Sequence, residues 1–168
     1  MATHQIRYIE KSDNPCLATI VRSSLAEFGA NRPGTVYYDP TTDQLFELFQ
    51  KPRSRYYVAL SQNEICGGGG IYPSDGLAED TCELVKMYLS PHARGKGLGR
   101  LLIEKCIQAA KEEKYRYIYL ETMPELKKAL SVYELFGFKY LNGPMGNTGH
   151  FGCDRWMLLD LEENQGSR

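Results

Sequence analysis

The residues best suited to chemistry lie in one glycine-rich stretch, Arg94-Gly95-Lys96-Gly97-Leu98-Gly99-Arg100, between an apolar segment and an amphipathic one. Glycine lets a backbone turn tightly and approach a ligand closely, because it has no Cβ. The first amides of a helix lack intrahelical partners, and the helix dipole places about half a positive charge at that end. Together with three basic side chains, this pattern predicts a site for a phosphate or pyrophosphate.

The spacing of the glycines excludes two common phosphate-binding loops. A P-loop requires Gly-x-x-x-x-Gly-Lys followed by Ser or Thr, and that sequence is absent here. The dinucleotide fingerprint Gly-x-Gly-x-x-Gly also fails, with Leu102 where a later glycine would fall. A simpler alternative stays open, in which the glycines only form a turn that joins a strand to a helix.

The elements that must position this turn follow from the periodicity of apolar residues. Strands are predicted at residues 5–10, 56–60, 65–72, 81–89, 116–121, 138–141 and 155–161. Helices are predicted from residues 12–15 to 28, from 42 or 43 to 49, from 97 to 113 and from 124 to 136. Glycine weakens a strand, so the run at residues 67–70 indicates a bulge or close backbone packing.

Length and charge limit the class of protein. With 168 residues, the chain is expected to form one domain, residues 1–168. Its net charge of −1 gives no reason to expect nucleic acid or a membrane as partner. The five cysteines show no pairing or metal-binding spacing, and the N-terminus lacks a signal peptide. We therefore expect a cytoplasmic protein without a metal, whose oligomeric state, homodimer included, stays open.

One motif supports a family resemblance. Arg-x-x-Gly-x-Gly directly follows a segment that ends Met-Tyr-Leu-Ser-Pro, and this resembles the GNAT superfamily of acyl-CoA-dependent N-acyltransferases. In that family the motif binds the pyrophosphate of coenzyme A. The order of predicted elements is similar to the GNAT fold over nearly the whole chain. The resemblance implies an α/β fold with a mixed, mostly antiparallel sheet of about seven strands, splayed in the middle and flanked by about four helices.

The resemblance also implies how acetyl-CoA binds as cosubstrate. In the family, backbone groups left unpaired where the central strand splays from the next one pair with the pantetheine arm. The implied cofactor-binding residues are Met87, Tyr88, Leu89, Arg94, Gly95, Lys96, Gly97, Leu98, Gly99 and Arg100. The alternative is that the first three are only sheet and core, which side-chain identity does not exclude because the implied contacts are backbone.

Glu83 is the candidate for the catalytic base. An alkylamine has a pKa near 10.4 and must lose a proton before it attacks a thioester. Glu83 lies six residues before Leu89 and matches the position of the catalytic glutamate in some protein-acetylating members. In a regular strand, residues 83, 85, 87 and 89 share one face, and a bulge would shift that register. Alternatively, the carboxylate only binds the ammonium of the acceptor or a neighbouring group.

Tyr133 is the candidate for the catalytic acid. It lies in Ala-Leu-Ser-Val-Tyr-Glu-Leu-Phe-Gly-Phe, which resembles the Ala-x-x-Leu/Val-Tyr-x-x-x-Gly-Phe pattern of the family. In many members this tyrosine hydroxyl reaches the sulfur of coenzyme A, and a phenol with a pKa of about 10 is a suitable donor to a thiolate. The alternative is a buried ring that packs on Phe136 or Phe138.

The acceptor site is expected in two loops, residues 29–41 and 143–154, with Tyr37, Tyr38 and His150 as tentative acceptor-binding residues. His150 is also an alternative base, because its pKa lies near neutrality, or else a solvated bystander. One position departs from the family: many members place a cofactor-binding asparagine where this chain has Leu126.

These features predict an acetyl-CoA-dependent N-acetyltransferase that acts on a small-molecule or amino-acid-like amine by direct attack in a ternary complex. None of the cysteines lies in an evident Cys/His pair, which is what a covalent acetyl-enzyme would need. Other interpretations stay open: a protein or peptide amine as acceptor, a non-catalytic acyl-CoA sensor or interaction module on the same fold, and a nucleotide-binding regulator.

Overall fold

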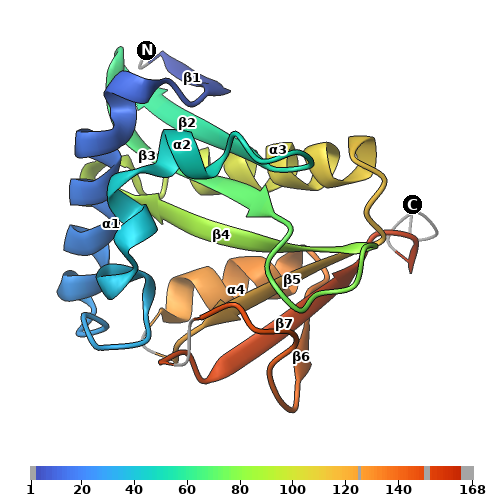
Figure 1. Ribbon diagram of the computed structural model, residues 1–168. Coiled ribbons are helices and arrows are strands. Elements are labelled where there is room, and N and C mark those ends of the chain that lie inside the picture. The colour runs from blue at the N-terminus through green and yellow to red at the C-terminus, as the bar shows by residue number, and fades with distance from the viewer. Residues whose placement is uncertain (1–2, 125, 150–151, 164–168) are drawn as a thin grey trace.

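A computed structural model describes residues 3–124, 126–149 and 152–163, and its centre is a seven-stranded sheet with helices on both faces (Figure 1). The strands are β1 (His4–Tyr8), β2 (Arg55–Ser61), β3 (Glu64–Tyr72), β4 (Thr81–Leu89), β5 (Tyr117–Thr122), β6 (Lys139–Leu141) and β7 (Arg155–Asp160). The helices are α1 (Asn14–Glu27), α2 (Leu45–Leu48), α3 (Leu98–Glu112) and α4 (Lys127–Leu135). Two 3-10 turns, η2 (Val36–Tyr38) and η3 (Pro40–Asp43), lie between α1 and α2.

The topology confirms the predicted mixed and mostly antiparallel sheet. Its strand order is β1-β2-β3-β4-β5-β7-β6. Every neighbouring pair runs antiparallel except β4 and β5, which are parallel. The predicted central strand, residues 81–89, coincides with β4. The fold class expected from the sequence is therefore correct.

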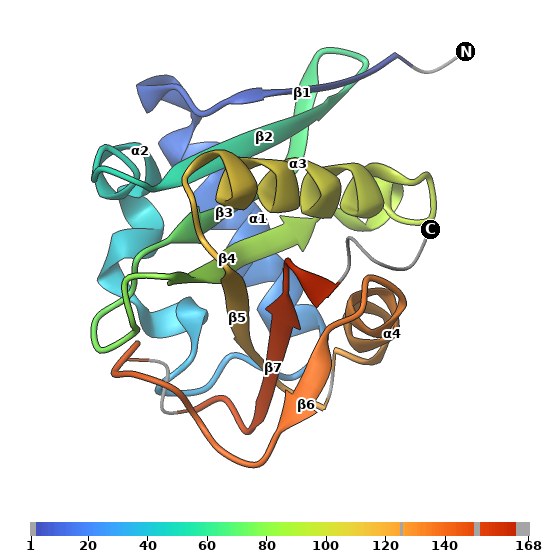
Figure 2. The same cartoon turned by 90° about the vertical axis from the view of Figure 1, so that its right-hand side faces the viewer.

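The two faces of the sheet carry separate hydrophobic cores. Helices α1 and α2 lie on one face, and α3 and α4 lie on the other (Figure 2). In β2, Tyr56 and Val58 pack toward α1 and α2, whereas Tyr57 and Ala59 pack toward α3. This alternation follows from the two-residue period of a strand. Both faces of the central strands are buried, so β4 is held in a fixed position.

The segment before α2 differs from the prediction. A helix was expected from Thr42 or Asp43, but α2 begins at Leu45. In η3 the carboxylate of Asp39 accepts hydrogen bonds from the Thr41 amide at 2.9 Å and from the Thr41 hydroxyl at 2.7 Å. This cap stabilises a separate 3-10 turn, as short acidic side chains do at the start of a helical turn. The loop between α1 and α2 is thus ordered by its own side chains.

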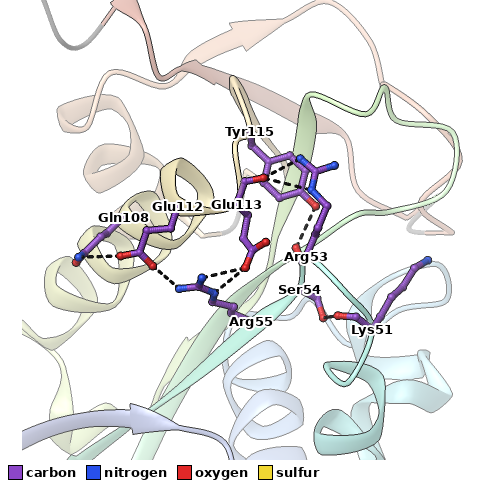
Figure 3. A network of polar contacts seen from close by, with 8 residues as sticks. All are labelled: Lys51, Arg53, Ser54, Arg55, Gln108, Glu112, Glu113 and Tyr115. Carbon is purple, nitrogen blue, oxygen red and sulfur yellow. Dashed lines mark hydrogen bonds and ion pairs between the residues drawn. The ribbon is translucent and has the colours of Figure 1, made fainter.

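Two arginines, one in β2 and one just before it, join this part of the chain to the C-terminal end of α3 (Figure 3). Arg55 forms ion pairs with Glu112 at 2.6 Å and with Glu113 at 2.9 Å. Just before the strand, the Arg53 guanidinium donates to the Glu113 carbonyl at 2.9 and 3.2 Å and to the Glu79 carbonyl at 2.8 Å. It also lies 3.9 Å from the centre of the Tyr115 ring. Arg53 therefore caps α3, where main-chain carbonyls lack helical partners.

We expect Arg53→Ala to lower the free energy of unfolding by about 1–3 kcal/mol, because three hydrogen bonds from a charged donor are lost. For a chain of this length the melting temperature should fall about 2–4 °C per kcal/mol, which calorimetry can measure. Lys51→Ala is the control: its exposed ammonium lies 5.3 Å from the Tyr72 ring centre, and its loss should cost less than about 0.5 kcal/mol. Equal melting temperatures for the two variants would contradict the capping role.

No helix in the described part of the chain is both long enough and apolar enough to cross a membrane.

Candidate active site

The site begins where β4 and β5 separate. The two strands pair through Thr81 with Tyr117, Cys82 with Ile118 and Glu83 with Tyr119. Beyond Glu83, β4 continues to Leu89 without a strand partner on this side among the described residues. Figure 2 shows the two strands diverging. Backbone groups along this edge of β4 are therefore placed to bind something other than a strand.

The glycine-rich turn lies at the far end of this opening. Gly95 has φ +73° and Gly97 has φ +83°, in the left-handed region that favours glycine. A Cβ built on either residue would meet no protein atom within 4 Å, so the space beside the turn is open. After the turn, the Leu101 amide donates a helical hydrogen bond to the Gly97 carbonyl at 3.1 Å. The amides of residues 98–100 precede that bond, and the turn fits a phosphate group.

The basic side chains of the turn have different surroundings. The Arg94 guanidinium donates to the Leu89 carbonyl at 3.0 Å and pairs with Glu27 of α1 at 2.9 Å. Arg94 therefore ties the turn to β4 and α1. Lys96 and Arg100 are exposed, and the Arg100 guanidinium lies 5.7 Å from the centre of the Phe136 ring.

Leu98 and Gly99 contribute backbone to the turn. The Leu98 side chain is fully buried in the α3 core, so only its backbone is available to a ligand. A Cβ on Gly99 would lie 3.5 Å from the Leu89 side chain, which is ordinary contact. The predicted phosphate site thus consists of main-chain amides supported by two exposed cations.

The strand itself contains a bulge that changes which side chains share a face. Val85 lies opposite Gly70 and Tyr88 lies opposite Gly68, so β4 has one residue more than β3 between these pairs. Residues 83, 85, 87 and 89 therefore do not share one face, because β4 has the bulge that was considered as the alternative to a regular strand. Val85 and Tyr88 pack toward α1 and α2, whereas Met87 and Leu89 pack toward α3. The extra residue reverses the alternation within the strand.

Glu83 lies at the point of the opening. It is 2% exposed, and its Oε1 accepts a hydrogen bond from the Ser74 hydroxyl at 2.6 Å. It stands opposite Tyr119 in the last pair of the parallel ladder. A carboxylate at this place, with a polar partner in reach, can accept a proton or bind an ammonium group.

A second carboxylate, that of Glu121, lies on β5, two residues after Tyr119. It accepts hydrogen bonds from the hydroxyls of Tyr119 at 2.7 Å and Thr148 at 2.6 Å. Burial, followed by the charges of Glu121 and Glu83, raises the pKa of the nearby Cys153 thiol to about 12. Cys153 is therefore a protonated, poor nucleophile near neutral pH. The two carboxylates make this end of the opening acidic.

Tyr133 lies on α4, with its ring 8% exposed and 5.7 Å from the Phe138 ring in an edge-on contact. The packing alternative is thus part of its environment. Burial raises the pKa of the Tyr133 hydroxyl, which stays protonated over the physiological range. Burial and then the nearby Tyr133 raise the pKa of Tyr88 on β4. Tyr133 belongs to the buried cluster against which Met87 and Leu89 of β4 pack, so it lies on the side of the strand that faces α3 and α4.

The loop after α1 and the loop before β7 meet at a cavity of about 450 Å³. Its lining residues are Pro33, Gly34, Thr35, Tyr38, Asp39, Pro40, Thr148 and Gly149. The Gly152 amide donates to the Gly34 carbonyl at 2.8 Å, which joins the two loops. Tyr38 is 58% exposed at this cavity, and its ring centre lies 5.0 Å from that of Tyr37. His150 lies outside the described residues.

The comparison with protein families shows which family the chain belongs to. Residues 18–138 match the model of the Acetyltransferase (GNAT) family. The chain belongs to the GNAT acetyltransferase family. This GNAT protein is therefore an acyltransferase. It is 38% identical to YjgM of Escherichia coli K12, an uncharacterized N-acetyltransferase, over 157 residues that cover 93% of this chain and 94% of the relative.

Solved structures agree with the GNAT fold. An acetyltransferase of the GNAT family from Staphylococcus aureus Mu50 is similar with a TM-score of 0.84 at 20% identity, covering 95% of this chain and 99% of that one. A second similar structure is yncA of Salmonella typhimurium, solved with its cofactor acetyl-CoA. It has a TM-score of 0.73 at 19% identity and covers 95% of this chain and 94% of that one.

At Leu126 the GNAT chain differs from the many family members that have a cofactor-binding asparagine. This residue precedes α4 and packs with Met123 and Cys153 in an apolar cluster. A polar side-chain contact with a cofactor is therefore not available from this position. Within residues 3–124, 126–149 and 152–163, no group of three or more His, Cys, Asp or Glu side chains is arranged to hold a metal ion.

Four residues of this GNAT site were missed by the sequence analysis: Asp39, Lys86, Glu121 and Thr148. Thr148 lines the cavity and donates to Glu121, while Asp39 lines the same cavity and pairs with Lys86 at 2.9 Å. One signal was available in the sequence, because Lys86 is a lone basic residue in an otherwise apolar stretch of strand. A charge there needs a buried partner.

Proposed function

We propose that this GNAT enzyme transfers the acetyl group of acetyl-CoA to the primary amine of a small-molecule or amino-acid-like acceptor, by direct attack in a ternary complex. The observation that carries the proposal is the buried carboxylate of Glu83 at the point where β4 and β5 separate. From Glu83 to Leu89 the strand spans roughly 20 Å, at about 3.3 Å per residue. An opening of this length suits an extended ligand.

The cosubstrate would be held mainly by main-chain groups. The turn at residues 95–99 and the first amides of α3 suit its pyrophosphate, and the free edge of β4 at residues 87–89 suits its amide-containing arm. The presence of acetyl-CoA in the similar structure of yncA supports the same cosubstrate here. Bound there, acetyl-CoA supplies an activated thioester.

Two side chains would move protons. Glu83, through water, takes a proton from the ammonium of the acceptor, so that the neutral nitrogen attacks the thioester carbonyl. The new carbon–nitrogen bond forms as the carbon–sulfur bond breaks, and the Tyr133 hydroxyl gives its proton to the departing thiolate. The attacking nitrogen then loses its second proton through water, which restores the Tyr133 hydroxyl and leaves the neutral amide. Burial raises the pKa of Tyr133, so the hydroxyl carries its proton when the thiolate forms, while the same shift makes it a weaker acid than a free phenol.

Direct attack is favoured over a covalent acetyl-enzyme by the state of Cys153. This thiol lies beside both carboxylates, and burial raises its pKa to about 12. Only a minute fraction would be thiolate near neutral pH, and the thiolate is the nucleophile. A small acceptor is favoured by the cavity of about 450 Å³, which falls in the usual range for small-molecule pockets.

The proposal is tested by measuring free-thiol release from acetyl-CoA with polyamines, amino acids, aminoglycosides, arylamines and lysine peptides. Calorimetry on the same preparation measures acetyl-CoA binding. Amine-dependent thiol release would support the proposal and identify the acceptor class. If the enzyme bound acetyl-CoA but none of these amines caused thiol release, an acyl-CoA sensor would be favoured instead. If the enzyme did not bind acetyl-CoA, the proposal would be overturned.

We expect Glu83→Gln to lower kcat by about 10²-fold, at the low end of the range for a general base because water can partly replace the relay. The acetyl-CoA affinity should stay unchanged, and Glu64→Gln, an exposed carboxylate on β3, is the matched control. A rise in the acceptor KM with kcat unchanged would show that Glu83 only binds the ammonium group.

A further inference from the structure

The bulge in β4 is centred on Lys86, whose backbone is unusual for a strand. Its φ is +52°, in the left-handed region that residues other than glycine rarely adopt. Such a conformation persists only where the surrounding structure holds it. Two contacts of Lys86, one from its carbonyl and one from its side chain, supply that restraint.

The first contact bears on two glycines of β3, Gly68 and Gly70. The hydroxyl of Tyr56, a fully buried residue of β2, donates to the Lys86 carbonyl at 2.8 Å. To reach it, the Tyr56 ring crosses β3 over two glycines. A Cβ on Gly68 would lie 2.6 Å from Cε1 of this ring, and one on Gly70 would lie 2.8 Å from Cδ2. The glycines therefore make room for the side chain that holds the bulge.

The second contact is an ion pair with the loop between α1 and α2. The Lys86 ammonium lies 2.9 Å from Oδ2 of Asp39, and the two side chains are 2% and 23% exposed. Burial lowers the pKa of Lys86, and the charges of Asp39 and Glu83 oppose that shift. The other oxygen of Asp39 accepts the two hydrogen bonds from Thr41. One carboxylate thus joins the central strand to the capped 3-10 turn.

A buried ion pair of this kind contributes little to the free energy of folding. Removing two charges from water carries a large desolvation cost, and apolar residues of the same size often serve a fold as well. Its position indicates another use. Asp39 lines the cavity of about 450 Å³, whereas Lys86 lies three residues from Glu83 on the same strand. The pair therefore connects a residue of the cavity wall to the strand that carries the candidate base.

We infer that Lys86 is a positioning residue for the acceptor: its pairing with Asp39 fixes the cavity wall relative to the strand that carries Glu83. This inference rests on the proposed function, because it assumes that an amine occupies the cavity. The bulge contributes by turning Tyr88 toward the same side of the sheet as Val85. The acceptor loop and the proton-accepting strand are then held as one unit.

The test removes both charges together. Breaking one side leaves an uncompensated buried charge, whereas removing both partners is often close to neutral for folding. In the Lys86→Met/Asp39→Asn variant, methionine keeps the length of the side chain, and asparagine keeps an oxygen for Thr41. The matched control is Asp43→Asn, which removes a more exposed ion pair, with Arg22 at 2.6 Å, from the same loop.

We expect the double variant to fold, to bind acetyl-CoA within about twofold of the wild type and to lose about 10–100-fold in kcat/KM for the acceptor. A displacement of about 1 Å in a reacting group can have an effect of this size. Asp43→Asn should stay within about twofold. A folded double variant with wild-type kcat/KM for the acceptor would overturn the inference.

Failure of the proposed function would give a different result: the wild-type enzyme would release no thiol from acetyl-CoA with any of the amines. The inference is then decided by hydrogen exchange, which needs no substrate. Amides of residues 36–44 should exchange faster in the double variant than in Asp43→Asn, with β2 unchanged. Equal exchange of residues 36–44 in the two variants would show that the pair does not hold the loop, and would overturn the inference.

Discussion

Tyr133→Phe should lower kcat by about 10²–10⁴-fold, the range found when a general acid is lost. The substitution removes one hydroxyl and keeps the ring that contacts Phe138 at 5.7 Å, so the fold and the affinity for acetyl-CoA should be preserved. Because burial raises the pKa of this hydroxyl, no titration of the donor is expected near neutral pH. Steady-state kinetics with an identified acceptor, together with calorimetry, measure both quantities.

The control for this prediction is Tyr140→Phe. The Tyr140 hydroxyl donates to Glu134 at 2.6 Å, and the residue is 49% exposed on β6. Its removal should leave kcat within about twofold, since exposed hydrogen bonds of this kind contribute little. If Tyr133→Phe turned over as fast as Tyr140→Phe, the role of Tyr133 would be packing, and another group would have to protonate the thiolate.

Gly97→Val should reduce the affinity for acetyl-CoA at least about 10²-fold. Gly97 caps α3 with φ +83°, a conformation that a β-branched residue adopts only with strain. A Cβ there would meet no protein atom within 4 Å, so the side chain would enter the space beside the helix amides. We therefore expect both a lower stability and a blocked phosphate site, measured by thermal unfolding and calorimetry.

Two further variants separate the strain from the blockage. Gly29→Val introduces the same strain elsewhere, because Gly29 has φ +70° and equally open surroundings at the end of α1; it should lose stability but keep its affinity. Gly97→Asn relieves the strain, since asparagine tolerates the left-handed region, yet still fills the site. Normal acetyl-CoA binding by Gly97→Asn and Gly97→Val would place the phosphate site elsewhere.

The sequence predicted the elements whose signals are local. The bounds of β4 follow from its apolar run, and the start of α3 follows from Gly97. The end of α4 at Leu135 follows from Gly137, with φ +97°, because glycine is preferred just after a helix. The splay could be expected only from the family resemblance, because nothing in β4 or β5 alone says that their ladder ends at Glu83.

The site was less predictable because it depends on contacts between distant residues. Lys86 stands out in the sequence as a lone charge in an apolar stretch, but its partner Asp39 lies 47 positions away and has no local signal. The bulge follows from where the Tyr56 side chain and the glycines of β3 meet, which periodicity does not encode. Glu121 likewise accepts a hydrogen bond from Thr148, which lies 27 positions away in the chain. Glu83 and Tyr133 were indicated by the family resemblance, because its motifs fix the position of a residue as well as its type.

The short parallel ladder between β4 and β5 is a weak connection between the two halves of the sheet. Three residue pairs join a four-stranded antiparallel half to a three-stranded one, so the ladder is a narrow seam between two larger bodies. A ligand that supplies hydrogen bonds along the opening would lengthen that seam and couple the motions of the halves. Binding and rigidity are then thermodynamically linked: ligand binding should slow hydrogen exchange in β5 and β7 as well as in the strand it touches.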